Sequence, residues 1–187
     1  MKEDISKAVD TLKAGGIILY PTDTIWGIGC DATNPDAVAK LNELKHRSKN
    51  KSMIILLENP TMLHSYVEQV PDMAWDIVEL TTKPLTIIYP RAKNLAPSLI
   101  AADGSVGIRI VKHAFCQRLI QTFRKPIVST SANIAGKPFP KNFSEIDSEI
   151  VAGVDYIVPS IYDEGNPPIP SGIISLGTGG EVKVIRE

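Results

Sequence analysis

Short apolar runs and helically spaced apolar positions alternate along most of this 187-residue chain. Continuous apolar runs of strand length predict strands that are covered on both faces of a sheet. Runs of this kind, some interrupted by a polar residue, occupy residues 17–20, 53–57, 84–89, 106–111, 126–128, 156–158, 172–176 and 182–185. Apolar residues spaced i, i+3, i+4 and i+7 predict amphipathic helices. These helices cover residues 4–14, 35–44, 60–70, 72–80, 115–123 and 145–151.

The order of these elements predicts an α/β fold. The last three strands lie too close together for helical crossovers between them, so we expect a mixed rather than a purely parallel sheet. No repeat, low-complexity tract or linker divides the sequence, which predicts one domain over residues 1–187. Residues 91–104 lack periodicity and predict a surface loop that could act as a lid.

Composition excludes several classes of protein. A hydrophobic content of 43% and a mean hydropathy of +0.02 are typical of a globular chain, and the net charge of −1 gives no overall attraction to nucleic acid. Cys30 and Cys116 are too few for a disulfide framework and show no zinc-ligand spacing, so we predict no metal site and a reducing, cytoplasmic location. No apolar run approaches the ~20 residues of a membrane span, so we expect no contact with a membrane.

Polar residues and glycines follow the first predicted strand directly. Pro21 cannot continue a hydrogen-bonded ladder, so the strand should stop there. Residues 22–24 then place two hydroxyls and a carboxylate at the carboxyl end of the strand, where open α/β sheets usually bind ligands. Gly27 and Gly29 have no Cβ and would allow the backbone to approach a ligand closely.

The same stretch formally matches a dinucleotide-binding fingerprint. Residues 27–32 read Gly-Ile-Gly-Cys-Asp-Ala, which fits G-x-G-x-x-G/A. In that fingerprint the glycines open the helix that holds the pyrophosphate, whereas here the helix start is signalled later, by Asn34 and Pro35. Dinucleotide binding is therefore a weak alternative, and no GxxxxGK[ST] sequence of a P-loop is present.

Positive charge is concentrated at the end of the following helix. Between residues 40 and 51 only Glu43 opposes the cations Lys40, Lys45, Arg47, Lys49 and Lys51 and the neighbouring His46. Cations late in a helix interact favourably with its dipole and usually face solvent. Because this cluster follows the hydroxyl- and glycine-rich loop so closely, we predict instead that it meets an anionic ligand.

A second group of polar residues follows the strand at 126–128. Residues 129–133 read Ser-Thr-Ser-Ala-Asn, which either form a simple turn or donate hydrogen bonds to a ligand. Arg109 lies within an apolar strand, where an unpaired guanidinium is costly to bury. It should either pair with an acid or face a cleft and bind a carboxylate, and we favour the cleft. The histidines show no triad or metal spacing, so the sequence does not favour covalent hydrolysis.

Four stretches taken together resemble the YrdC/Sua5/TsaC family of threonylcarbamoyl-AMP synthases. In chain order they are PTDTIWGIGCDA, LKHR with its K-x-R, VGIRI, and STSANIAGKP with its S-x-N. PSGIISL and the terminal Val-Ile-Arg also look like closing strands of this family, so the resemblance covers nearly the whole chain. Within the family, the chain resembles the short, TsaC-like form. It implies a twisted mixed β-sheet flanked by helices around a basic concave cleft, a fold of the YrdC/RibB-like type.

The activity implied by the resemblance joins L-threonine, bicarbonate and ATP into threonylcarbamoyl-AMP and releases pyrophosphate. Mg²⁺ would accompany ATP, and no tightly bound organic cofactor is expected. The product would serve N6-threonylcarbamoyladenosine formation at position 37 of tRNA, with tRNA and the transfer proteins acting downstream. No protein nucleophile is needed, because the threonine amine captures the carbon and the enzyme aligns and neutralises anions.

The resemblance also assigns site residues. L-Threonine would be bound by Thr24, Arg109, Ser129 and Ser171. ATP would be bound by Lys45, Arg47, Lys51, Ser105, Ser131, Asn133 and Arg186, of which Lys45, Arg47, Ser131 and Asn133 would be catalytic. The chain departs from the usual family pattern at Ser48, Leu56, Lys83 and Gly172. These departures concern amino-acid recognition more than nucleotide binding.

A non-catalytic RNA-binding module is the alternative from another functional class. The basic residues between 40 and 51 would grip tRNA or rRNA, but Trp26 is the one ring near them in the sequence, whereas single-strand RNA readers usually interleave several aromatics with their cations. RNA affinity that falls steeply with salt, without ATP consumption, would favour this alternative.

Overall fold

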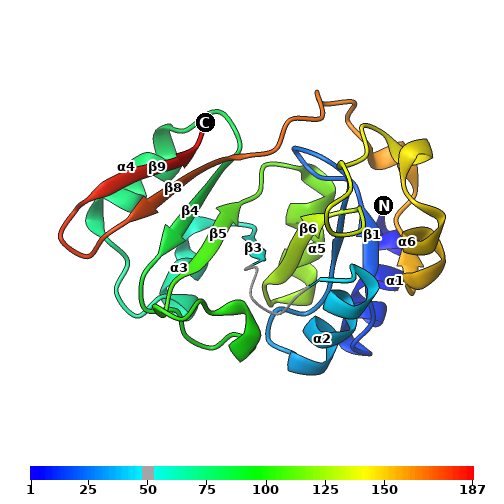
Figure 1. The fold of residues 1–187 in the computed structure, drawn as a ribbon, viewed down its shortest axis with the longest axis horizontal. Helices are drawn as coiled ribbons and strands as arrows, with labels where there is room; N and C mark the ends of the chain where they lie inside the picture. The colour runs from blue at the N-terminus through cyan, green and yellow to red at the C-terminus, as the bar shows by residue number, and fades with distance from the viewer. Residues whose placement is uncertain (48–52) are drawn as a thin grey trace.

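The computed structural model describes residues 1–47 and 53–187, and within them nine strands form one twisted mixed sheet (Figure 1). Across the sheet their order is β7-β1-β2-β6-β3-β5-β4-β8-β9. Their bounds are β1 Ile18–Tyr20, β2 Gly27–Gly29, β3 Ile54–Leu57, β4 Leu85–Tyr89, β5 Val106–Ile110, β6 Ile127–Ser131, β7 Tyr156–Ile157, β8 Gly172–Leu176 and β9 Val182–Arg186. β7 pairs with β1, β3 with β5, and β4 with β8 in parallel, and the remaining neighbours are antiparallel. The predicted α/β class with a mixed sheet is confirmed.

Helices cover both faces of this sheet (Figure 1). They are α1 Lys2–Lys13, α2 Pro35–Leu44, α3 Leu63–Tyr66, α4 Asp72–Leu80, α5 Ala114–Phe123 and α6 Ser148–Gly153, with single 3₁₀ turns at Pro60–Met62, Pro97–Leu99, Phe143–Glu145 and Ser160–Tyr162. Leu56 packs against α1 and α5 on one face, while its neighbours Ile55 and Leu57 pack with α2 on the other. Because successive strand residues face opposite sides, burial of both faces explains the continuous apolar runs.

Local sequence signals fix the start of α2. The Asn34 side chain accepts hydrogen bonds from the backbone N–H groups of Asp36 and Ala37, and Pro35 occupies the first helical position. The helix ends with His46 in the left-handed conformation at φ +52°. The bonds from His46 N to Glu43 O and from Arg47 N to Asn42 O are those of a Schellman motif. This end of α2 brings the predicted cations to the sheet.

Three predicted features differ from the structure. The glycine-rich stretch that we expected to be a loop contains strand β2, which pairs with β1 and β6. The helix expected over residues 60–70 is limited to a 3₁₀ turn and the short α3, because Val67 is extended and forms a bridge with Ala92. The segment 91–104, which we expected to be a surface loop that could act as a lid, has one 3₁₀ turn and several exposed residues, but its middle is anchored to the core. Leu99 is fully buried, and Ala96 N donates to Ala32 O at 2.9 Å. The surface loop is therefore confirmed, while its buried middle argues against movement as a lid.

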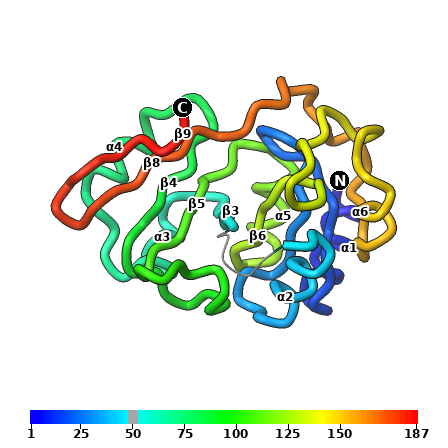
Figure 2. Tube along the Cα trace, viewed as in Figure 1, coloured from blue at the N-terminus to red at the C-terminus, as the bar shows by residue number. Residues whose placement is uncertain are grey.

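The chain crosses from one edge of the sheet to the other between β7 and β8. Residues 163–171 make this crossing without regular secondary structure, as the orange segment of Figure 2 shows. The Trp26 indole fastens its start by donating to Asp163 Oδ2 at 2.8 Å. Within residues 1–47 and 53–187, no helix combines the length and apolar character needed to cross a membrane.

Candidate active site

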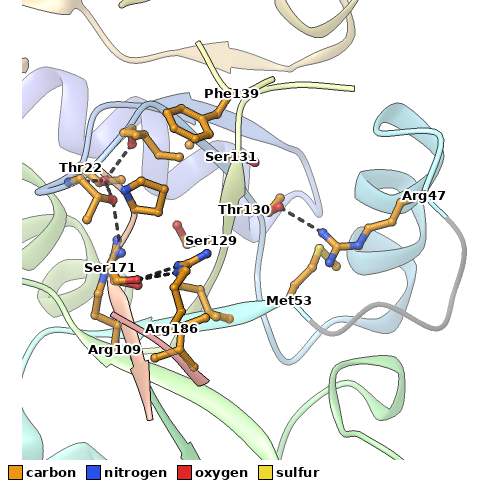
Figure 3. A pocket seen from close by; sticks show the side chains of 16 residues that line it. Thr22, Arg47, Met53, Arg109, Ser129, Thr130, Ser131, Phe139, Ser171 and Arg186 are labelled. Carbon is orange, nitrogen blue, oxygen red and sulfur yellow. Dashed lines mark hydrogen bonds between the residues drawn. The ribbon is translucent and has the colours of Figure 1, made fainter. Parts of the chain in front are cut away.

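A cavity of about 320 Å³ opens where the ends of several strands meet (Figure 3). The residues predicted for the site that line it are Thr24, Arg47, Arg109, Ser129, Ser131, Ser171 and Arg186. They come from positions far apart in the sequence, on the loop after β1, the end of α2, and strands β5, β6, β8 and β9 or their flanks. Three arginines and no carboxylate line the cavity among the described residues, so it is suited to anionic ligands.

Arg109 lies in the wall of this cavity and is 3% exposed. Its Nη2 is 3.2 Å from Asp23 Oδ1, and its Nη1 donates to Thr24 Oγ1 at 3.2 Å. Asp23 in turn accepts a hydrogen bond from Lys112 N at 3.0 Å. Both sequence interpretations of Arg109 therefore hold, since the guanidinium pairs with an acid and also faces the cleft. The pairing fixes the plane of the guanidinium before any ligand arrives.

The Thr22–Thr24 turn is held by its own hydrogen bonds. Thr22 Oγ1 is 2.8 Å from the carbonyl of Ile25 and accepts a bond from Thr24 N at 3.1 Å. The two threonine hydroxyls are 2.9 Å apart. These contacts bury both hydroxyls beside Arg109 and place them on the cavity wall. The turn thus gives the carboxyl end of β1 a rigid polar surface.

Strand β6 supplies hydroxyls at Ser129, Thr130 and Ser131, all of which line the cavity. Arg47 Nη1 donates to Thr130 Oγ1 at 3.2 Å, which joins the end of α2 to this strand (Figure 3). Burial lowers the pKa of the Arg47 guanidinium. An arginine remains protonated in spite of such a shift, so Arg47 brings a permanent positive charge to the hydroxyl row.

The opposite side of the cavity is formed at the start of β8 and the end of β9. Arg186 Nε and Nη2 donate to the carbonyl of Ser171 at 3.0 and 2.7 Å (Figure 3). The Ser171 hydroxyl is 2.8 Å from Thr86 Oγ1 on β4. Burial and then the charge of Arg109 lower the pKa of Arg186. Arg109 and Arg186 therefore lie close enough to repel each other. An anion bound between them would stabilise both charges.

The remaining predicted residues do not line this cavity. Lys45 is buried behind β6 and Asn133 donates its amide to Lys137 O at 2.6 Å. The Ser105 hydroxyl donates to Asp103 Oδ1 at 2.6 Å in the turn before β5. Lys51 and the departure at Ser48 lie outside the described residues. Gly172 is also absent from the lining, and a Cβ added there would lie 3.3 Å from Leu85 Cδ1 and 3.6 Å from Arg186 O.

The two glycines of the fingerprint have different roles. They lie in β2 and not at the start of a helix, so the dinucleotide interpretation is wrong. A Cβ on Gly29 would come within 2.0 Å of Val128 O, so this glycine allows β2 to pack against β6 and does not approach a ligand. A Cβ on Gly27 would lie 3.4 Å from Ser129 Oγ, and Gly27 does line the cavity.

Several apolar lining residues were not predicted as site residues. Met53, Ile54 and Ile173 belong to runs that indicate only a buried strand, and sequence gives no sign that they face a cavity. Phe139, which is 38% exposed, comes from the irregular loop after β6. Its position between Pro138 and Pro140 was the one available signal of a rigid, exposed ring. These side chains add apolar surface to a cavity that is also lined by cations and hydroxyls.

A mixed α/β sheet whose strand ends gather arginines and hydroxyls in one cavity defines a protein that binds small anionic ligands. Within that class, the chain belongs to the Sua5/YciO/YrdC family. The model of this family, described under telomere recombination, matches residues 10–187.

Named relatives and solved structures agree with this membership. A threonylcarbamoyl-AMP synthase of Photobacterium profundum is 34% identical over 79% of this chain and 82% of its own length. The corresponding protein of Cellvibrio japonicus is 33% identical over 96% of this chain and 94% of its own. These relatives are enzymes, and the chain shares their family.

The structural neighbours include Sua5 of P. abyssi complexed with L-threonine, with a TM-score of 0.82 and 26% identity over 92% of this chain. This chain spans 50% of that longer protein. E. coli YciO has the same fold, with a TM-score of 0.83 at 22% identity over the whole of this chain and 90% of its own length. The fold expected from the resemblance is confirmed.

Proposed function

We propose that this protein is an L-threonylcarbamoyladenylate synthase, a nucleotidyltransferase that makes threonylcarbamoyl-AMP and pyrophosphate from L-threonine, bicarbonate and ATP. The observation that carries the proposal is the convergence of Arg47, Arg109 and Arg186 with a row of hydroxyls on one cavity of about 320 Å³. The names of the relatives favour the synthase over the non-catalytic RNA-binding alternative.

The amino acid would bind on the Arg109 side. Arg109 is held by Asp23 and Thr24 and has its Nε buried without a hydrogen-bond partner, so it can still donate to a carboxylate. The hydroxyls of Thr24, Ser129 and Ser171 surround the same space and would orient the amine and the substrate hydroxyl. The L-threonine reported with P. abyssi Sua5 supports this ligand class.

The nucleotide would bind on the side formed by Arg47, Ser131 and Arg186. Among the described residues no group of three or more His, Cys, Asp or Glu side chains could hold a metal ion. We propose that Mg²⁺ enters with ATP, held largely by phosphate oxygens and water, as this ion usually is at nucleotide sites. The predicted nucleotide contacts of Lys51, Ser105 and Asn133 stay predictions.

The chemistry needs alignment and charge neutralisation. The threonine amine attacks bicarbonate-derived CO₂ and loses a proton to form a carbamate. A carbamate oxygen then attacks the α-phosphorus of ATP, and the bond to the bridging oxygen breaks as pyrophosphate leaves. Arginines at both ends of the cavity would neutralise the two anions as they approach and the charge that develops on the leaving pyrophosphate.

The test measures pyrophosphate release by the purified protein with Mg·ATP, L-threonine and bicarbonate. We expect release that stops when either threonine or bicarbonate is omitted. Equal release without threonine would contradict the proposal. Salt-sensitive binding of tRNA without ATP consumption would favour the RNA-binding alternative instead. With the synthase established, addition of tRNA and transfer proteins would test the proposed downstream partners.

A further inference from the structure

Among the described cations between residues 40 and 47, Lys45 is the least exposed, and it does not line the cavity. It is 2% exposed, and its ammonium donates to the carbonyls of Ser131 at 2.5 Å and Asn133 at 2.7 Å. Ala135 N donates in return to Lys45 O at 2.9 Å. Lys45 therefore fastens the end of α2 to both ends of the 131–133 segment.

The helix end explains why Lys45 and Arg47 point to different places. His46, between them, has φ +52° and closes the Schellman motif, and its ring is 2.5 Å from Glu149 Oε1 on α6. On either side of this left-handed residue, Lys45 reaches the carbonyls of Ser131 and Asn133, whereas Arg47 lines the cavity and donates to Thr130 Oγ1. Residues 130 and 131 are thus held from both sides by the two cations.

The surroundings of Lys45 make this a costly arrangement for stability alone. Among the described residues no carboxylate forms an ion pair with its ammonium. Burial, and then the charge of Arg47, lower the pKa of Lys45 to about 7. A buried, uncompensated ammonium is unfavourable unless hydrogen bonds satisfy it, and two carbonyls do so here. Lys45 is nearly inaccessible and does not line the cavity, so in this arrangement its ammonium does not face a phosphate bound there.

We propose that Lys45 is a positioning residue, which acts through the peptide carbonyls of Ser131 and Asn133 to hold the segment that presents the Ser131 hydroxyl to the nucleotide. It makes no contact with the nucleotide itself. This inference rests on the proposed function, because it explains how the nucleotide side of that cavity is organised. Arg47 is the phosphate-binding cation, and Lys45 determines where the hydroxyl opposite it lies.

The first test is amide hydrogen exchange of the ligand-free protein, followed by peptide mass spectrometry. Lys45→Met should speed exchange in the peptide that covers residues 131–135, because the carbonyls lose their anchor. Arg47→Met is the matched control and should leave exchange at 133–135 within twofold of the wild type. Unchanged exchange in Lys45→Met overturns the proposal. If Lys45→Met does not fold, Lys45→Gln replaces it, since its amide keeps a polar group at this position; its shorter side chain should still speed exchange over residues 131–135.

The second test is a double-mutant cycle on the dissociation constant of Mg·ATP, measured by calorimetric titration. A lost hydrogen bond of ordinary strength predicts that Ser131→Ala weakens binding about tenfold in the wild type. The same change should weaken it less than twofold in Lys45→Met, because the hydroxyl is already misplaced there. Effects that multiply would show that Lys45 acts independently of Ser131 and would overturn the proposal.

These tests separate the two proposals. Amide hydrogen exchange is measured without ligand, and the double-mutant cycle measures Mg·ATP binding without catalysis. Both therefore report on Lys45 even if the protein releases no pyrophosphate. Absence of threonine-dependent pyrophosphate would reject the synthase, whereas unchanged exchange or multiplicative binding effects would reject only the role of Lys45.

Discussion

Replacement of Arg109 by methionine should have two separable effects. The first is on stability, since Asp23 is 7% exposed at its side chain and would keep a buried charge without its cation. Breaking a buried ion pair from one side typically costs about 3–5 kcal/mol of unfolding free energy. At about 2–4 °C per kcal/mol for a chain of this size, the melting temperature should fall by roughly 6–20 °C.

The second effect of this replacement is on the KM for threonine. A charge-assisted hydrogen bond is worth about 1.5–3 kcal/mol, so loss of one of them should raise the KM for threonine by about 10- to 10²-fold, and loss of two by more. Asp23→Asn/Arg109→Met is the matched control, because it removes both charges at once. It should recover most of the lost stability while the KM for threonine stays high.

Urea unfolding and pyrophosphate release at varied threonine concentrations give the two quantities. Two results would refute the reasoning. If the double variant were as unstable as Arg109→Met, the ion pair with Asp23 would not be the source of the loss. If the KM for threonine were unchanged in both variants, Arg109 would not bind the substrate carboxylate.

Three further predictions concern neighbouring parts of the cavity. Arg47→Ala should remove most ATP-dependent pyrophosphate release while changing the melting temperature little, because Arg47 lies past the apolar stripe of α2; circular dichroism and the release assay check this. Gly29→Ala should lower the free energy of unfolding by about 3 kcal/mol or more, since the new Cβ would lie 2.0 Å from Val128 O. Gly27→Ala, by contrast, should fold normally. Because its new Cβ would narrow the cavity, it should raise the KM of a substrate. The unfolding free energy of the wild type should rise with pH above about 7 relative to Lys45→Met, because the lowered pKa of Lys45 means that the unfolded chain binds more protons there.

Each of these has an outcome that would contradict it. Normal activity of Arg47→Ala would remove this residue from the phosphate site. Equal stability of the two glycine variants would show that β2 and β6 are not too close at Gly29 to accept a side chain there. A wild type and a Lys45→Met variant with parallel pH dependence between pH 7 and 9 would mean that Lys45 keeps its ordinary pKa when the protein folds.

Much of the secondary structure could be predicted because its signals are local. The Asn34 cap and the following proline give the first residue of α2, and Arg109 falls on a strand as expected. The prediction was wrong where a long-range contact overrides the local preference. Helical spacing continues through Val67, but its bridge with Ala92 ends the helix. The segment around Leu99 lacks a pattern because its burial comes from neighbours distant in the sequence.

The sequence by itself determined most of the helices and strands, the cap of α2 and the motif positions that carry hydroxyls and cations. The tertiary structure alone decided that β6 lies between β2 and β3, which brings Ser131 beside the end of α2. It also decided that, of two cations separated by one residue, Arg47 reaches the cavity and Lys45 binds carbonyls behind it. The physical reason is that periodicity and capping depend on neighbours within a turn, whereas strand order and the direction of a side chain depend on packing and hydrogen bonds between distant segments.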